Sequence, residues 1–261
     1  MRGAGHRWLV FVLASTLSVG VRAGADLPHV GLWRLNPARS DFGGLTLAFA
    51  PAPGGALRSS VNGGEYHTIS LDGRDVPTHS GYSSSWRQLD TRTWSATTKL
   101  NGAVISTDRF QLADDDKTLT LTSTGKQSDG KPFTNRLTYV RTTGRTGLAG
   151  TWKARTVAQD EEPIEFLRRG EHGLTLRTAN ATCEAALDGK DYPLTGPTMP
   201  AGATLSLTQT GPRSILLLQK QDGRVIYKST SAVAADGRTL TETILDVASG
   251  RTKATKVYDR E

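Results

Sequence analysis

The sequence predicts an all-β protein in which two tandem antiparallel up-and-down barrels follow an N-terminal signal peptide. Three observations support this prediction. Apolar and polar residues alternate with a period of two, Asn-Gly and Asp-Gly pairs recur between the alternating stretches, and the two halves of the 261-residue chain share motifs. Period-two alternation is typical of half-buried strands, and Asn-Gly or Asp-Gly pairs favour the tight turns of antiparallel hairpins.

Residues 1–23 have the pattern of a secretory signal peptide. Basic Arg2 and Arg7 precede an apolar run at 8–13, and small residues follow near Ala23. A basic region, an apolar region and a small-residue cleavage site in this order indicate export. The apolar run is shorter than a spanning helix requires, as is every later one. We therefore expect a periplasmic or secreted protein with no membrane span in the mature chain.

The charge balance argues against nucleic acid as a partner. The chain carries 32 Lys and Arg against 25 Asp and Glu, a net charge of +7. Removing residues 1–23 takes away Arg2, Arg7 and Arg22 and lowers the net charge to +4. The remaining basic residues are scattered among acidic ones, without the dense basic run that marks a nucleic-acid patch. We expect a solvated surface of mixed charge.

Beyond the leader the chain is a duplication with a period of roughly 120 residues. The matching segments are 31–33 with 150–152, 71–77 with 187–193, 101–105 with 222–226, 117–120 with 238–241, and 139–141 with 258–260. A short polar, glycine-containing link at 142–147 separates the copies, as expected between compact units. The sequence therefore predicts one barrel over residues 26–143 and a second over residues 147–261.

Each unit is expected to hold about eight to ten short strands. In the first unit they are placed at approximately 30–36, 44–50, 56–62, 65–71, 83–89, 93–100, 103–112, 117–125 and 133–141. A meander of this length must protect its edge strands, and closure into a barrel does so most completely. A two-sheet sandwich is the competing architecture. A barrel of about eight strands has room for packed side chains or one small ligand.

Each unit opens with Gly-x-Trp and has an Arg in its last strand. The Trp residues are Trp33 and Trp152, and the Arg residues are Arg141 and Arg260. This resembles the lipocalins, in which a Trp at the bottom of the first strand is covered by an Arg from a late strand. It resembles more closely a group of exported bacterial lipocalin-like tandem-repeat proteins with no established activity. The resemblance implies that these four residues are structural, with a cation–π contact within each unit. In the second unit Lys256 shares the face of Arg260.

The sequence contains no motif that would identify a catalytic or metal centre. It has no G-x-S-x-G elbow, no P-loop and no H-x-x-x-H or H-E-x-x-H pair. Cys183 is a single thiol, so it is interpreted as a buried small hydrophobe. We expect no cofactor and no metal, and we favour a non-catalytic protein. An enzyme remains the third hypothesis, because site residues can come from distant strands.

Aromatic and His residues are unevenly divided between the units. Residues 65–95 of the first unit contain six of them, whereas 182–213 of the second contain only Tyr192. Because ligand pockets are rich in aromatic side chains, we expect the first barrel to bind a small, partly apolar molecule. The candidate contacts are Tyr66, Trp86 and Trp94, with Arg109 or His67 as polar partners. The alternative is a cell-envelope module with two filled barrels that binds a protein or glycan.

Overall fold

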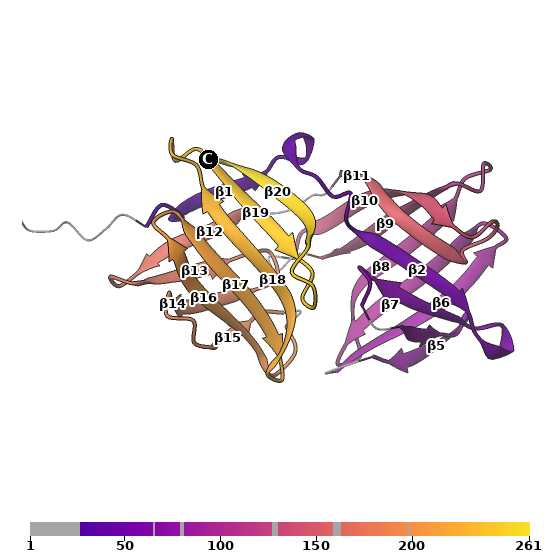
Figure 1. Cartoon of the computed structure of the whole chain (residues 1–261). Coiled ribbons are helices and arrows are strands. Elements are labelled where there is room, and N and C mark those ends of the chain that lie inside the picture. Colours follow the sequence, from indigo (N-terminus) through magenta and orange to yellow (C-terminus); the bar gives the residue numbers. More distant parts are fainter. Residues whose placement is uncertain (1–26, 65, 79–80, 127–129, 159–162, 198) are drawn as a thin grey trace, which may run out of the picture.

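The computed structural model describes residues 27–64, 66–78, 81–126, 130–158, 163–197 and 199–261. Within these ranges the chain consists mainly of strands, which form two ten-stranded antiparallel sheets (Figure 1). One sheet is a closed barrel and the other is nearly closed. The prediction of an all-β fold with two barrels is confirmed. The expected signal peptide, residues 1–23, lies outside the described residues.

The first barrel is built from one continuous stretch of chain. Its strands are β2 (Thr46–Pro51), β3 (Leu57–Val61), β4 (His67–Ile69), β5 (Asp72–Pro77), β6 (Tyr82–Asp90), β7 (Thr93–Leu100), β8 (Ala103–Leu112), β9 (Thr118–Lys126), β10 (Pro132–Thr143) and β11 (Gly150–Ala158). Strand β11 pairs with both β10 and β2, which brings the two ends of the meander together. The edges of the sheet are β4 and β5.

The second barrel is built from two separate stretches of chain. Its strands are β1 (Gly31–Leu35), β12 (Ile164–Arg169), β13 (Gly173–Arg177), β14 (Thr182–Ala186), β15 (Tyr192–Thr195), β16 (Ala203–Gly211), β17 (Ser214–Gln221), β18 (Arg224–Val233), β19 (Thr239–Leu245) and β20 (Thr252–Arg260). Strand β1 pairs with β12 on one side and β20 on the other, and so closes the barrel. In Figure 1, indigo β1 lies among the orange and yellow strands of this barrel.

The two copies have thus exchanged their first strands. The predicted division into 26–143 and 147–261 is wrong for β1, which joins the second barrel, and for β11, which joins the first. Both strands carry Gly-x-Trp, so the repeat pattern identifies the strand without assigning its partner. The link at 142–147 does not separate the barrels. It belongs to the β10–β11 hairpin, which closes a short loop at low entropic cost.

Residues 36–45 carry the chain from the second barrel to the first. They include the 3-10 turn η1 (Pro37–Arg39), and a second 3-10 turn, η2 (Pro53–Gly55), follows β2. Asn36 Nδ2 donates to Asp259 Oδ2 at 2.6 Å, and Arg39 Nη1 donates to Asp259 Oδ1 at 2.7 Å. Further along, the backbones of Asp41 and Thr255 form a β-bridge. The crossing segment is therefore anchored to β20 before it enters the first barrel.

The predicted turns at 62–63, 101–102 and 222–223 are confirmed, and the one at 72–73 is not. Asp129 of the predicted turn at 129–130 lies outside the described residues. Asn62, Asn101 and Asp222 each have positive φ and precede a glycine at a strand connection, as tight hairpin turns require. The Asp72-Gly73 pair instead lies inside β5, a strand that the sequence pattern did not predict. The pairing of β5 with β6 is irregular between Asp72 and Asp75. The pair therefore forms a bulge, another place where positive φ is needed.

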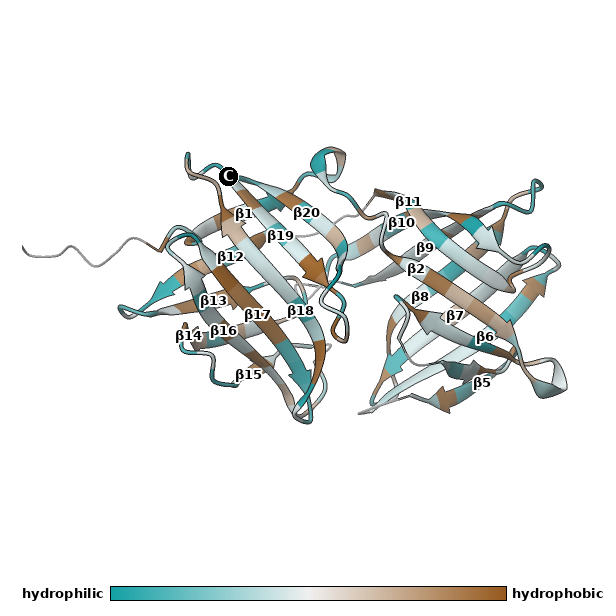
Figure 2. Ribbon diagram, in the orientation of Figure 1, coloured by the Kyte–Doolittle hydropathy of each residue, from teal (hydrophilic) through white to brown (hydrophobic). Residues whose placement is uncertain are grey.

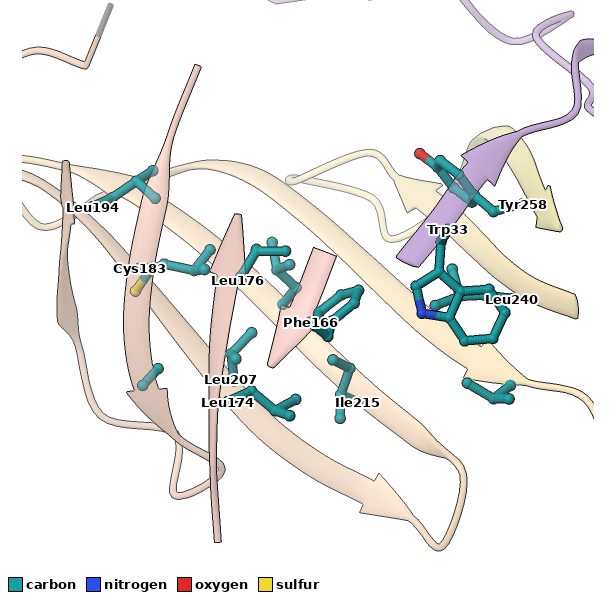
Figure 3. Close-up of a cluster of buried hydrophobic side chains, with 14 of the residues drawn as sticks. Trp33, Phe166, Leu174, Leu176, Cys183, Leu194, Leu207, Ile215, Leu240 and Tyr258 are labelled. Atoms are coloured by element: carbon teal, nitrogen blue, oxygen red, sulfur yellow. The ribbon is translucent and has the colours of Figure 1, made fainter. Parts of the chain in front are cut away.

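Each barrel has its own hydrophobic core. Figure 2 shows that both hydrophobic and hydrophilic residues occur along the strands of each sheet. Trp152 is fully buried in the core of the first barrel, and Trp33 is fully buried in that of the second. Figure 3 shows Trp33 beside Leu240 and Tyr258, with Phe166 and Ile215 nearby. Each exchanged strand thus contributes a central residue to the core it enters.

No helix among the described residues has the length and apolar character needed to cross a membrane.

Candidate functional site

The four residues of the Gly-x-Trp and Arg motifs form two matching contacts. Arg141 Cζ lies 4.0 Å from the centroid of the Trp152 ring, and Arg260 Cζ lies 4.4 Å from that of Trp33. The predicted Arg-over-Trp contact is present in both barrels, but each Arg covers the Trp of the other copy. Strand exchange is the reason, since it moves both Trp residues.

Each of these Arg residues also organises the backbone at its end of the barrel. Arg260 donates to the carbonyl oxygens of Pro28, Val30 and Gly237, at 2.7, 2.9 and 2.6 Å. Arg141 donates in the same way to those of Asp116, Gly147 and Ala149, at 2.6, 2.5 and 2.7 Å. These bonds fix one end of each barrel, so the contacts support the fold and leave the opposite end for a ligand.

The five residues predicted to bind a ligand in the first barrel do not converge. Tyr66 is 50% exposed, and the Arg58 guanidinium lies 5.4 Å from its ring. His67 and Arg109 are also exposed, and Arg109 neighbours inward-facing Phe110 on β8, which places it on the outer face. Only Trp86 and Trp94 belong to the core of this barrel.

Aromatic rings fill the interior of the first barrel. Trp86 stacks on Phe110, with ring centroids 4.9 Å apart, and meets Phe49 edge-on at 5.9 Å. Phe49 and Phe110 are 6.1 Å apart in an edge-on arrangement. Such packing gains energy from ring contacts as well as from burial. The aromatic content that predicted a pocket in this barrel serves instead to fill it.

A cavity of about 360 Å³ lies in the second barrel. It extends to the end opposite the Arg260–Trp33 contact, where its lining includes the turn at 178–181 and Met199. Phe133 and Asn135 of β10 also line it, so the first barrel forms part of the rim. This volume lies within the range of small-molecule sites.

The cavity exists because the second barrel lacks three of the rings that fill the first: Leu207, Ile215 and Ser231 stand in the places of Trp86, Trp94 and Phe110. Strand pairing places Ser231 where the first barrel has Phe110: Phe110 lies between Trp94 and Leu121, and Ser231 lies between Ile215 and Glu242. By the same comparison, Leu207 occupies the position of Trp86. Replacing Trp and Phe by Leu, Ile and Ser removes the side-chain volume that occupies the first barrel.

The lining of the cavity divides into two walls. The apolar wall consists of Phe166, Leu176, Leu194, Leu205 and Leu217. The polar wall is formed by β17 to β20 and contains the apolar Leu240 beside six polar side chains, those of Gln219, Tyr227, Ser231, Glu242, Lys256 and Tyr258. A ligand in this space would contact apolar side chains on one side and hydrogen-bonding side chains on the other.

Glu242 is at the centre of the polar wall. The Tyr227 hydroxyl donates to its Oε1 at 2.8 Å, and the Tyr258 hydroxyl donates to its Oε2 at 3.1 Å. Lys256 is directly opposite Glu242 on the neighbouring strand, and Ser231 is opposite it on the other side. We call Ser231, Glu242 and Lys256 the polar row. The first barrel has Phe110, Leu121 and Leu137 at the equivalent positions.

Ser231 is the member of the polar row with an unused hydrogen-bonding group. Its side chain is 4% exposed, and its hydroxyl has no hydrogen-bond partner among the described residues. A buried hydroxyl without a partner is costly. Its oxygen is enclosed by protein atoms, so Ser231 contributes an unsatisfied polar group to the wall of the cavity.

Two other reactive groups are buried near the cavity wall. His29 Nε2 lies 3.3 Å from the Ser231 carbonyl oxygen, and the His29 ring meets Phe166 edge-on at 5.8 Å. Burial is the main cause that lowers the pKa of His29, which favours the neutral ring. Burial likewise raises the pKa of Cys183 to about 11, so its thiol stays protonated at neutral pH.

A comparison with protein-family models and with curated protein sequences finds no match. The cavity geometry therefore carries the functional argument. The sequence held two signals for this site that aromatic content obscured. Lys256 shares the inward face of Tyr258, and Glu242 interrupts an alternating apolar face after Leu240.

Proposed function

We propose that this is an exported, non-catalytic binding protein whose second barrel holds a small amphipathic molecule. The supporting observation is the cavity with its apolar and polar walls. Apolar surface buried on binding contributes about 25 cal/mol per Å², and a few placed polar groups fix orientation. The signal-peptide pattern at 1–23 supports export.

The proposal moves the ligand from the first barrel to the second and gives the first barrel a structural role. Its packed rings support that role. Its strand β10 contributes Phe133 and Asn135 to the rim of the cavity. The first barrel therefore assists binding from outside while its own interior is filled.

The test is titration of the full chain with N-phenyl-1-naphthylamine, an uncharged probe whose fluorescence rises in apolar surroundings. We expect saturable binding at one site per chain. Ser231→Phe places the ring of the first barrel in the cavity and should abolish binding. Ala232→Phe is the matched control, because Ala232 is the exposed neighbour on the same strand.

Two results would contradict the proposal: no saturable binding by the natural protein, or equal binding by the Ser231→Phe and Ala232→Phe variants. Circular dichroism checks that both variants fold. Because an added ring can strain a packed core, Ser231→Leu provides a smaller filling. It should weaken binding less than Ser231→Phe does.

A further inference from the structure

The closed end of each barrel, where the Arg–Trp contact lies, is built around a different residue. In the first barrel the Trp152 indole donates to the backbone carbonyl oxygen of Leu148 at 2.9 Å. In the second barrel the Trp33 indole donates to that of His29 at 2.8 Å. Leu148 and His29 are both 3% exposed. The second barrel therefore buries a titratable ring at the position where the first buries an apolar side chain.

Residues 27–30 lie at the closed end of the second barrel, and we call them the latch. Arg260 donates to the backbone carbonyl oxygens of the two residues on either side of His29. Arg141 does the same around Leu148 in the first barrel. The same fastening thus surrounds an ionisable side chain in one barrel and an apolar side chain in the other.

The His29 ring contacts one residue from each wall of the cavity. Its Nε2 lies 3.3 Å from the backbone carbonyl oxygen of Ser231, and its ring meets Phe166 edge-on with centroids 5.8 Å apart. Since a carbonyl oxygen only accepts hydrogen bonds, Nε2 carries the proton of the neutral ring. Ser231 and Phe166 both line the cavity. Displacement of the ring would therefore remove support from both walls.

The surroundings of His29 favour its neutral form. Burial is the largest influence and lowers its pKa, the hydrogen bond to the Ser231 carbonyl oxygen raises it, and the charge of Arg260 lowers it further. The neighbouring strands carry these charged or titratable side chains at inward positions: Arg168 on β12, Tyr227 on β18, Glu242 on β19, and Lys256, Tyr258 and Arg260 on β20. The Glu242 carboxylate accepts hydrogen bonds from both tyrosines. A proton added to His29 would thus place a second cation beside Arg260.

We propose that the latch is a pH-sensitive device, which closes the second barrel at neutral pH and loosens in acid so that the ligand is released. This inference rests on the proposed binding function and adds its regulation. The ordinary pKa of His is about 6.5. Because the pKa of His29 is lower when the latch is closed, the open state takes up a proton first as the pH falls. Acid therefore shifts the equilibrium toward the open state and away from the state that binds the ligand.

The experiment is titration of the full chain with N-phenyl-1-naphthylamine at about pH 7.5 and about pH 5. We expect the dissociation constant of the natural protein to rise at least about fivefold in acid. His29→Leu supplies the residue type of the first barrel, and His29→Gln keeps a donor for the Ser231 carbonyl oxygen. Both variants should bind equally well at the two pH values. Leu148→His is the matched control, because it puts the ring at the closed end of the first barrel and should leave the pH dependence of binding as in the natural protein.

Equal affinity of the natural protein at both pH values would overturn the inference, as would an acid loss of affinity in His29→Gln as large as that of the natural protein. Urea unfolding gives a second readout that needs no ligand. The natural protein should lose more stability in acid than His29→Gln, and an equal loss would contradict the latch. Both proteins have the same carboxylates, so other effects of acid cancel. If the fluorescent probe fails to bind the natural protein at neutral pH, the proposed function fails, and urea unfolding alone then decides whether the latch responds to pH.

Discussion

The two barrels share their strand order and their Arg–Trp contacts, yet their interiors differ. In the first, Phe49, Trp86 and Phe110 pack ring against ring. In the second, Ser231 and Leu207 replace two of those rings, and a cavity lies beside a polar row. The Arg–Trp contacts are common to both barrels and belong to the barrel fold itself. The inward-facing residues decide whether the interior is filled or hollow.

The largest expected effect on stability comes from removing the Trp of one exchanged strand at a time. Trp33→Ala should destabilise the second barrel by about 3–5 kcal/mol, because it removes a fully buried indole. Trp152→Ala should do the same to the first barrel. Hydrogen exchange measured by mass spectrometry, resolved by barrel, checks both. Loss of protection over 164–260 in Trp152→Ala alone would contradict the strand exchange.

A second pair of variants sharpens the contrast between filled and hollow interiors. Phe110→Ala should cost about 3 kcal/mol, since it leaves a cavity beside Trp86. Ser231→Ala at the equivalent position should change stability by less than about 0.5 kcal/mol, because its hydroxyl already lacks a partner. Urea unfolding measures both. Equal costs at the two positions would show that the two interiors are packed alike.

A variant at the rim of the cavity tests whether the first barrel contributes to ligand binding in the second. Phe133→Ala should raise the dissociation rate of N-phenyl-1-naphthylamine by up to about tenfold, since the ring covers part of the cavity. Stopped-flow dilution of the complex gives this rate. Tyr66→Ala serves as the control, because Tyr66 is exposed on the first barrel and should have no effect.

A modest, pH-dependent effect on stability is expected at the carboxyl group of Asp108, inside the first barrel. Burial is the main cause that raises its pKa. As the pH rises above the ordinary pKa of Asp, the unfolded chain ionises first, so this group lowers the stability of the folded state. Asp108→Asn should therefore stabilise the protein at pH 7 by a modest amount, about 1 kcal/mol, and should have little effect below pH 4. Urea unfolding at both pH values provides the measurement, and a loss of stability at pH 7 would contradict it.

The sequence predicted most of the fold because strand patterning and turn chemistry are local. Thr118 to Thr122 alternates clearly, and Asn101-Gly102 marks a hairpin, so β8 and β9 were placed within a residue or two. The exchange of β1 and β11 could not be predicted, because Trp33 and Trp152 have equivalent neighbours in sequence. Which strands pair with each other depends on the path of the chain in three dimensions, and a local sequence pattern does not contain that path.

The candidate site was misplaced for a related reason. Aromatic residues are typical both of pockets and of filled cores, and Trp86 distinguishes these cases only when its neighbours are known. The informative residues were polar ones on an inward face. Glu242 and Lys256 are separated by 14 positions in sequence, and only the pairing of β19 with β20 brings them opposite each other.

A crystal structure of the protein under xenon pressure tests the central claim most directly, since xenon enters dry apolar cavities. We expect xenon beside Leu176 and Leu217 in the second barrel, none among the rings of the first, and β1 paired with β12 and β20. Xenon between Trp86 and Phe110, or β1 paired with β2 and β10, would contradict the account.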